Sequence, residues 1–150
     1  MRNQKEIIIT QINKILDQKI ETANLEIRSL KESLESENKC TVGDKYETGR
    51  ARLQAELEKS SIQLLKIEKL KYKLSKIDLH KKYNNAEFGS LVITNSANYF
   101  ISLAIGKIEV GNKSWFCISL ASPIGKLLYL KKAGDEFIFN GKELKIKAII

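Results

Sequence analysis

Residues 16–34 read LDQKIETANLEIRSLKESL, and the apolar residues recur in steps of four, three, four, three and four. The residues in this pattern are Leu16, Ile20, Ala23, Ile27, Leu30 and Leu34. Such alternating steps are typical of a coiled-coil helix that packs along one apolar stripe. Because residues 6–36 contain no glycine or proline, we expect one continuous helix over about this range.

A second apolar stripe of the same kind runs through about residues 48–78. It consists of Leu53, Leu57, Ser60, Leu64, Ile67, Leu70, Leu74 and Ile77. The two helical stretches cover 31 residues each, and a short polar segment with Gly43 and Gly49 joins them. Helices of equal length with a short connection pair most simply as an antiparallel hairpin. We therefore expect residues 1–80 to form a coiled-coil hairpin whose tip lies near residues 41–50.

Residues 81–150 differ in composition, since they hold nine of the eleven aromatic residues. Six short runs rich in β-branched and aromatic residues predict strands. These runs are residues 91–94, 99–105, 107–110, 115–120, 137–139 and 144–149. The pairs Gly111-Asn112 and Asn140-Gly141 supply residues that tolerate the positive φ of tight hairpin turns. Ser122-Pro123 is typical of a helix start and predicts one short helix through about Leu130.

The predicted fold class is therefore α+β, with a helical hairpin followed by a small antiparallel sheet that carries one short helix. Trp115, Phe116, Phe137 and Phe139 are expected in the core of the sheet. Cys117 lies in a predicted strand between Phe116 and Ile118, and we expect it to be a small buried apolar residue.

Composition excludes several classes of protein. The two cysteines, Cys40 and Cys117, lie 77 positions apart, and the first residues do not have the pattern of a signal peptide. We therefore expect no disulfide framework, and we expect a cytoplasmic location. No apolar run approaches the roughly 18 residues of a membrane span. The single histidine, His80, leaves little room for histidine-based metal sites. It follows the second helix, where we expect it to be exposed or to favour the helix dipole.

Net charge is +8, with 26 Lys and Arg residues against 18 Asp and Glu residues. No dense basic block of the kind found in nucleic-acid or lipid tails is present. Only four of the basic residues are arginines, and two of these, Arg50 and Arg52, lie close to the expected tip. The charge is thus consistent with solubility and modest steering toward a partner that carries nucleic acid.

The expected tip carries two acids three residues apart, Asp44 and Glu47, in the run Gly-Asp-Lys-Tyr-Glu. Acidic residues at a helix start commonly cap the helix and oppose its dipole, and this structural role is one interpretation of the pair. Gly49 follows closely and lowers helix propensity by about 1 kcal/mol relative to alanine. It favours either a later start of the second helix or a looser tip.

Residues 43–47 resemble the Gly-Asp-x-x-Glu tip of the transcript cleavage factors GreA and GreB. Residues 118–137 resemble the C-terminal signature of the same family, in which Ile-Ser and Ser-Pro precede a short helix and a Gly-Asp pair. The resemblance covers nearly the whole chain. It implies an FKBP-like domain over residues 81–150 that docks at the rim of the RNA polymerase secondary channel, and a coiled coil that enters the channel.

The resemblance also implies roles for individual residues. Asp44 and Glu47 would complete a Mg²⁺ site shared with the polymerase and help to cleave backtracked RNA at its 3′ end. Tyr46, Arg50 and Arg52 would contact that RNA by stacking and by phosphate binding. The polymerase-docking residues would be Ser122, Pro123, Ile124 and Gly125. The chain would be a monomeric cofactor of the polymerase rather than an enzyme, with no tightly bound metal and no membrane partner.

The tip departs from the family pattern, and the departure keeps alternatives open. Thr48-Gly49-Arg50-Ala51 replace the family's Asn-Ala-Glu-Tyr after the second acid, and Lys45-Tyr46 replace Leu-Lys between the acids. A regulator that occupies the channel without supporting cleavage is therefore one alternative. A coiled-coil adaptor that binds another coiled coil is a second, and Arg50 or Arg52 could serve only to pair with glutamates of the coil.

Overall fold

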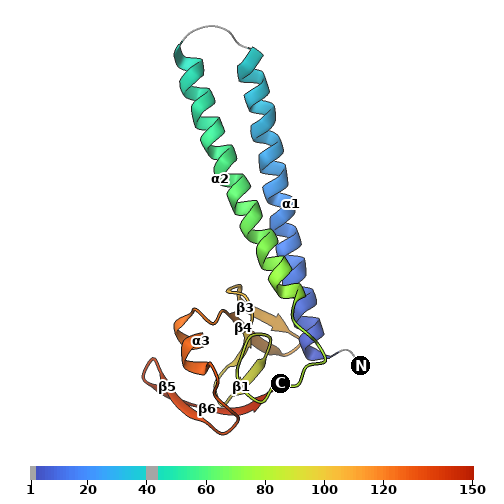
Figure 1. Cartoon of the computed structure of the whole chain (residues 1–150), viewed down its shortest axis with the longest axis vertical. Helices are drawn as coiled ribbons and strands as arrows, with labels where there is room; N and C mark the ends of the chain where they lie inside the picture. The colour runs from blue at the N-terminus through green and yellow to red at the C-terminus, as the bar shows by residue number, and fades with distance from the viewer. Residues whose placement is uncertain (1–2, 40–43) are drawn as a thin grey trace. The chain divides into compact units, whose positions relative to one another are not determined.

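A computed structural model describes residues 3–39 and 44–150, with the side chains of residues 38, 39 and 44–47 outside the description. Helix α1 spans Gln4–Lys39 and helix α2 spans Asp44–Ser75 (Figure 1). The chain divides into two compact units. The hairpin unit is Asn13–Tyr72, and the sheet unit combines Met1–Ile12 with Lys73–Ile150.

The hairpin unit is an antiparallel pair of helices, as predicted. Each residue of the two predicted stripes is buried or half-buried, whereas most of the intervening residues are exposed. The side chains of Asp17 and Lys71 form an ion pair that joins the early part of α1 to the late part of α2. The repeat of apolar residues along each helix therefore selects the face on which the helices meet.

Helix α2 starts earlier than Gly49 led us to expect. It begins at Asp44 and continues through Gly49 without interruption. A Cβ atom at Gly49 would lie 3.1 Å from Oε1 and 3.2 Å from Oε2 of Glu37. The expectation of a delayed start was thus wrong, and the glycine instead lets the Glu37 side chain of α1 lie close to the backbone of α2.

The sheet unit contains six strands and one short helix, which confirms the α+β class. The strands are β1 (Leu91–Thr94), β2 (Asn98–Ile101), β3 (Gly106–Val110), β4 (Lys113–Ile118), β5 (Glu136–Phe139) and β6 (Lys142–Ile149). Their order in the sheet is β3-β4-β2-β1-β6-β5. Helix α3 (Pro123–Leu128) connects β4 to β5.

One strand pairing makes the sheet mixed rather than purely antiparallel as predicted. Strands β2 and β4 run parallel, with Asn98 opposite Trp115 and Ile101 opposite Ile118, whereas the other pairings are antiparallel. After β2 the chain passes to the edge position, forms β3, and returns through a tight turn into β4. Because β4 runs antiparallel to β3, it runs in the same direction as β2.

Both predicted hairpin turns form. Asn140 and Gly141, between β5 and β6, both have positive φ, at 52° and 77°. This is the pattern of a type I′ turn. Between β3 and β4 only Gly111 has positive φ, at 63°, which matches the first central position of a type II′ turn. The glycine and asparagine positions therefore fix the two hairpins.

Both faces of the sheet are buried. Beneath α3 lies a core whose members include Val92, Ile101, Leu128 and Ile146. On the opposite face Leu91, Phe100, Trp115 and Cys117 are at most 1% exposed. The ends of the long helices add to the buried residues of this unit through Ile8, Ile12 and Leu74.

The predicted aromatic core is largely correct. Trp115 and Phe137 are buried, and Phe139 packs against the core as a partly buried residue. Phe116 was wrongly predicted, because it is 37% exposed and only tilts against Tyr99 with a ring-centre distance of 5.9 Å. Cys117 is buried as expected, and burial raises the pKa of its thiol to about 12, so it remains a protonated apolar group.

Within the residues that the structure describes, neither long helix has an apolar stretch sufficient to cross a lipid bilayer.

Candidate functional site

The predicted acidic pair lies where α2 begins. Asp44 is the first residue of the helix and Glu47 is the fourth, so the two positions are three residues apart in the first helical turn. Positions with this spacing share one side of a helix. The side chains of Asp44, Tyr46 and Glu47 lie outside the described part of the chain, and their proposed roles therefore remain predictions.

The two arginines after the acidic pair are exposed on α2. Nε of Arg52 lies 3.5 Å from Oε1 of Glu56, four residues further along the same helix, and the Arg52 side chain is 82% exposed. An exposed pair of this kind contributes little to stability. The guanidinium of Arg52 is therefore held only weakly and would be available to a partner.

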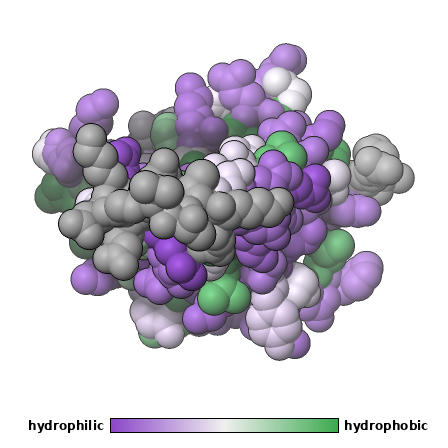
Figure 2. All heavy atoms as spheres, turned by 90° about the horizontal axis from the view of Figure 1, so that it is seen from above, coloured by the Kyte–Doolittle hydropathy of each residue, from purple (hydrophilic) through white to green (hydrophobic). Residues whose placement is uncertain are grey.

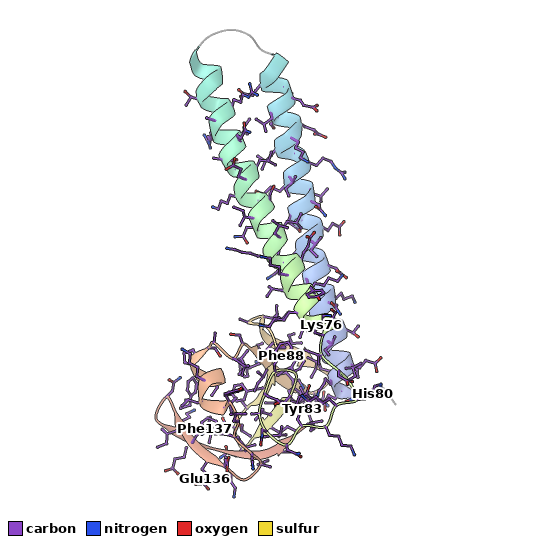
Figure 3. The ribbon with its side chains drawn as sticks, in the orientation of Figure 1. Lys76, His80, Tyr83, Phe88, Glu136 and Phe137 are labelled. Carbon is purple, nitrogen blue, oxygen red and sulfur yellow. The ribbon has the colours of Figure 1, made fainter. Side chains whose placement is uncertain are left out.

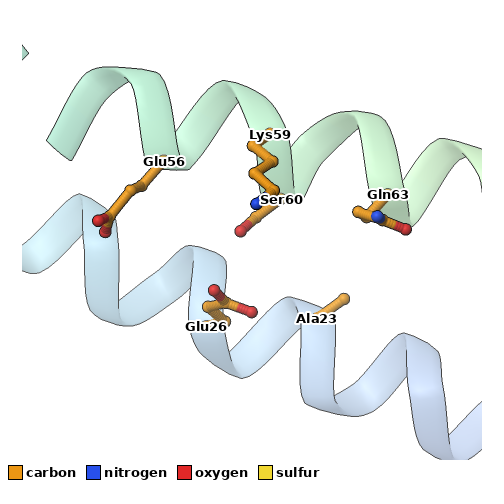
Figure 4. Close-up of a pocket in the computed structure, with 6 residues that line it drawn as sticks. All are labelled: Ala23, Glu26, Glu56, Lys59, Ser60 and Gln63. Carbon is orange, nitrogen blue, oxygen red and sulfur yellow. The ribbon is translucent and has the colours of Figure 1, made fainter. Parts of the chain in front are cut away.

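A hollow lies between the helices where both stripes carry a small residue. Ala23 of α1 and Ser60 of α2 occupy positions at which neighbouring layers have leucine or isoleucine. The resulting cavity of about 410 Å³ is also lined by Glu26, Glu56 and Lys59 (Figure 4). Among the described residues, no group of three His, Cys, Asp or Glu side chains is arranged to hold a metal ion.

The predicted docking residues build the start of α3. Ser122 caps the helix, because its Oγ accepts a hydrogen bond of 3.1 Å from the backbone N–H of Gly125 and donates one of 2.7 Å to the carbonyl of Ser119. Ile124 is buried in the core, and Gly125 is buried too. Pro123 is exposed and Ser122 half-buried. The surface that this segment offers to a partner is therefore mainly Pro123.

Exposed apolar residues gather at the end of α3, and sequence reasoning did not identify them. Leu127, Tyr129 and Leu130 are 38%, 50% and 53% exposed, while Leu128 between them is fully buried. The signal was present as four consecutive apolar residues, 127–130, because a short helix can turn only part of such a run toward its core. These three side chains and Pro123 form what we call the α3 surface.

A buried lysine was also missed. The Lys5 side chain is 1% exposed, and its Nζ donates a hydrogen bond of 3.1 Å to the carbonyl of Ile150. The same Nζ lies 4.3 Å from the centre of the Tyr83 ring, a favourable position for a cation over an aromatic face. Tyr83 lies on the segment that follows α2, near His80 (Figure 3). No local pattern predicts this contact, since it joins residues far apart in sequence.

Burial controls the charge of Lys5. Desolvation lowers its pKa from 10.5 to about 8, and attraction to Asp78 opposes the change only in part. Between about pH 8 and pH 10.5, Lys5 therefore carries its extra proton in the unfolded chain but not in the folded chain. Stability contributed at this residue therefore rises with pH across that window, by at most about 3 kcal/mol.

Replacing Lys5 by methionine should remove this pH dependence. We expect Lys5→Met to be about 2 kcal/mol more stable than the parent chain at pH 7, and the advantage to shrink by pH 9.5. Urea denaturation of both proteins at the two pH values measures the difference, and the contribution of Cys117 cancels because both proteins retain it. Lys14→Met, at an exposed position of α1, is the control. Parallel pH profiles for parent and Lys5→Met would contradict the prediction.

Comparison with known proteins gives matches among solved structures. No family model matches the chain, and no curated protein matches it. One solved structure is described as "Structure of the transcription factor Gfh1", and its sequence is 19% identical to this chain. The match covers 94% of this chain and 92% of the Gfh1 chain, with a TM-score of 0.34.

Proposed function

We propose that this chain is a Gre-type transcription elongation factor, which binds RNA polymerase through the secondary channel and stimulates cleavage of backtracked RNA. The observation that carries the proposal is the position of Asp44 and Glu47 in the first turn of α2, at the point where a two-helix hairpin reverses direction. An acidic pair at this point is suited to reach a site that a bulkier protein surface could not enter. The resemblance of residues 43–47 and 118–137 to GreA and GreB supports the same assignment.

The chemistry requires a partner. Mg²⁺ prefers octahedral oxygen ligands and releases its waters reluctantly, so two carboxylates alone would hold it weakly. Asp44 and Glu47 would therefore complete a Mg²⁺ site to which the polymerase contributes further ligands. The ion would stabilise the attacking and leaving oxygens of the phosphoryl displacement. This chain would bind no metal tightly by itself and would act as a cofactor rather than an enzyme.

The neighbouring residues would bind the RNA 3′ end. Arg50 and Arg52 are exposed, and guanidinium groups form paired hydrogen bonds with phosphate oxygens. Tyr46 would stack on a displaced base. The weak pair between Arg52 and Glu56 would be given up at little cost when RNA binds.

The sheet unit would provide the docking surface. Pro123, Leu127, Tyr129 and Leu130 are exposed apolar side chains on or next to α3, and apolar residues of this kind often form the centre of a protein interface. In this proposal Ser122, Ile124 and Gly125 act by shaping the helix start that presents them. The factor would act as a monomer in the cytoplasm, next to the polymerase.

A transcript cleavage assay tests the proposal. Purified RNA polymerase is stalled in a backtracked complex with end-labelled RNA, and the chain is added in the presence of Mg²⁺. We expect shortening of the RNA from its 3′ end and resumed elongation when nucleotides are supplied. Polymerase binding with inhibited elongation and no cleavage would instead support the regulator that only occupies the channel. No binding to polymerase would overturn both.

The coiled-coil adaptor has one specific observation in its favour. Leu25, Ile62 and Leu65 are each more than half exposed on the hairpin helices. Most of the coloured surface visible in Figure 2 is hydrophilic, with a few hydrophobic residues between. A partner helix could cover these residues. Loss of binding to a coiled-coil partner on Ile62→Lys and Leu65→Lys, with no polymerase bound by the parent chain, would favour this function.

A further inference from the structure

A pocket of about 390 Å³ opens within the sheet unit, beside the segment that follows α2. Its lining includes four nitrogen bases, Lys5, His80, Lys81 and Lys82, together with the ring of Tyr83. Among the described residues that line it there is no aspartate or glutamate. The lining of the pocket therefore groups three lysines and the histidine at one place.

Nearby carboxylates neutralise only part of this charge. Oε1 of Glu87 lies 2.8 Å from Nζ of Lys81, and the resulting hydrogen bond is the largest cause of a raised Lys81 pKa. Asp78 accepts a 2.9 Å hydrogen bond from the backbone N–H of His80. Within the described part of the chain, neither Lys5 nor Lys82 forms an ion pair with a carboxylate. Asp78 still attracts the Lys5 ammonium through space, so among the described residues of the pocket Lys82 is the lysine left without a carboxylate close to it.

Two further features of the pocket lining favour an anion, namely the Lys5 ammonium and the start of α1. Lys5 is buried and its Nζ uses one of three donor protons on the carbonyl of Ile150, so further donors of this ammonium can serve a ligand. Helix α1 begins beside the pocket, since Asn3 lines it and precedes the helix. The backbone N–H of Lys5 donates a hydrogen bond of 3.2 Å to Oδ1 of Asn3, and the positive end of the helix dipole attracts anions. Buried charge strengthens each of these interactions.

We propose that this pocket binds the phosphate groups of a small ligand of about mononucleotide size. Lys5, Lys82 and His80 would hold the phosphate oxygens, and the apolar side chains of Leu79 and Ile149, which also line the pocket, would contact the remainder of the ligand. The inference does not depend on the proposed role in transcription, because it concerns the free protein and residues remote in sequence from the acidic pair.

His80 provides a direct test, because it is the single histidine of the chain. Its ring signals in a proton–nitrogen NMR spectrum report on this pocket alone. Inorganic pyrophosphate and ATP are titrated separately into the full chain at low ionic strength, with sodium chloride at matched ionic strength as the control. We expect saturable shifts of the His80 signals with the two phosphate compounds and none with sodium chloride.

Variants identify the site. Lys82→Ala removes an exposed ammonium and should weaken pyrophosphate binding about tenfold, whereas Lys147→Ala, an exposed lysine of β6, should bind as the parent chain does. Equal affinity of the Lys82→Ala variant and the parent would overturn the proposal, as would shifts that sodium chloride reproduces. A third titration with a short single-stranded RNA separates the two sources of phosphate. Binding of RNA without binding of pyrophosphate or ATP would overturn the small-ligand assignment.

Discussion

A variant with Asp44→Asn and Glu47→Gln should lose cleavage stimulation on the order of 100-fold while binding RNA polymerase as tightly as the parent chain. The substitutions keep the size of both side chains and remove the charges that would hold Mg²⁺. Both positions lie in the first turn of α2, remote in sequence from the α3 surface that would dock. Cleavage rate and polymerase affinity should therefore separate in this variant.

The control removes the same charge from another part of α2. Glu58→Gln with Glu68→Gln changes two exposed glutamates of that helix and should cleave at the rate of the parent chain. The comparison is made in single-turnover cleavage assays at saturating factor, with binding measured by competition. Unchanged cleavage by the Asp44 and Glu47 variant would eliminate the metal role of the pair and leave the capping role.

Replacing Gly125 by alanine should destabilise the sheet unit by about 3 kcal/mol or more. A Cβ atom at this position would lie 2.1 Å from the carbonyl oxygen of Ser119, 2.9 Å from Oγ of Ser122 and 3.0 Å from Cα of Leu120. Two of these neighbours are backbone atoms, so no side-chain rotation relieves the overlap. The start of α3 would have to move, and Ile124 would leave its place in the core.

Gly49→Ala is the matched comparison, since it adds the same methyl group to a helical glycine of the other unit. There the nearest atoms are the carboxylate oxygens of Glu37, at 3.1 and 3.2 Å, and a flexible side chain can move away. The gain in helix propensity is about 1 kcal/mol, so this variant should be as stable as the parent or more stable. Thermal unfolding followed by circular dichroism and by Trp115 fluorescence distinguishes the two. Equal melting temperatures for parent and Gly125→Ala would show that the α3 start is not rigid.

Local patterns predicted the elements well, because each depends on a short-range property of the chain. The repeat of Leu16, Ile20 and Ala23 marks the face that α1 buries, and Ser122 marks the start of α3. The turn at Asn140 and Gly141 follows from the positive φ that these residues tolerate. Such signals require no knowledge of what lies elsewhere in the fold.

Pairings between distant segments were not predictable in the same way. The parallel alignment of β2 with β4 depends on β3 taking the edge position, and the strand sequences do not encode this order. Phe116 alternates with the buried Trp115 and Cys117, so strict alternation would have placed it on the more exposed side. The pocket at Lys5 combines three segments of the chain, and its lysines resemble surface lysines when each is considered alone.

The bond between Lys5 and Ile150 joins residues 145 positions apart, and this has a consequence for the order of synthesis. Strand β1 exchanges backbone hydrogen bonds with Ile150, while Ile8 and Ile12 belong to the same buried set. During translation, at roughly 5–20 residues per second, the start of α1 is made long before its partner Ile150, which lies 145 positions further along the chain. For several seconds the nascent chain exposes the isoleucines of its first turns, and a chaperone that recognises apolar helices would find its binding site there.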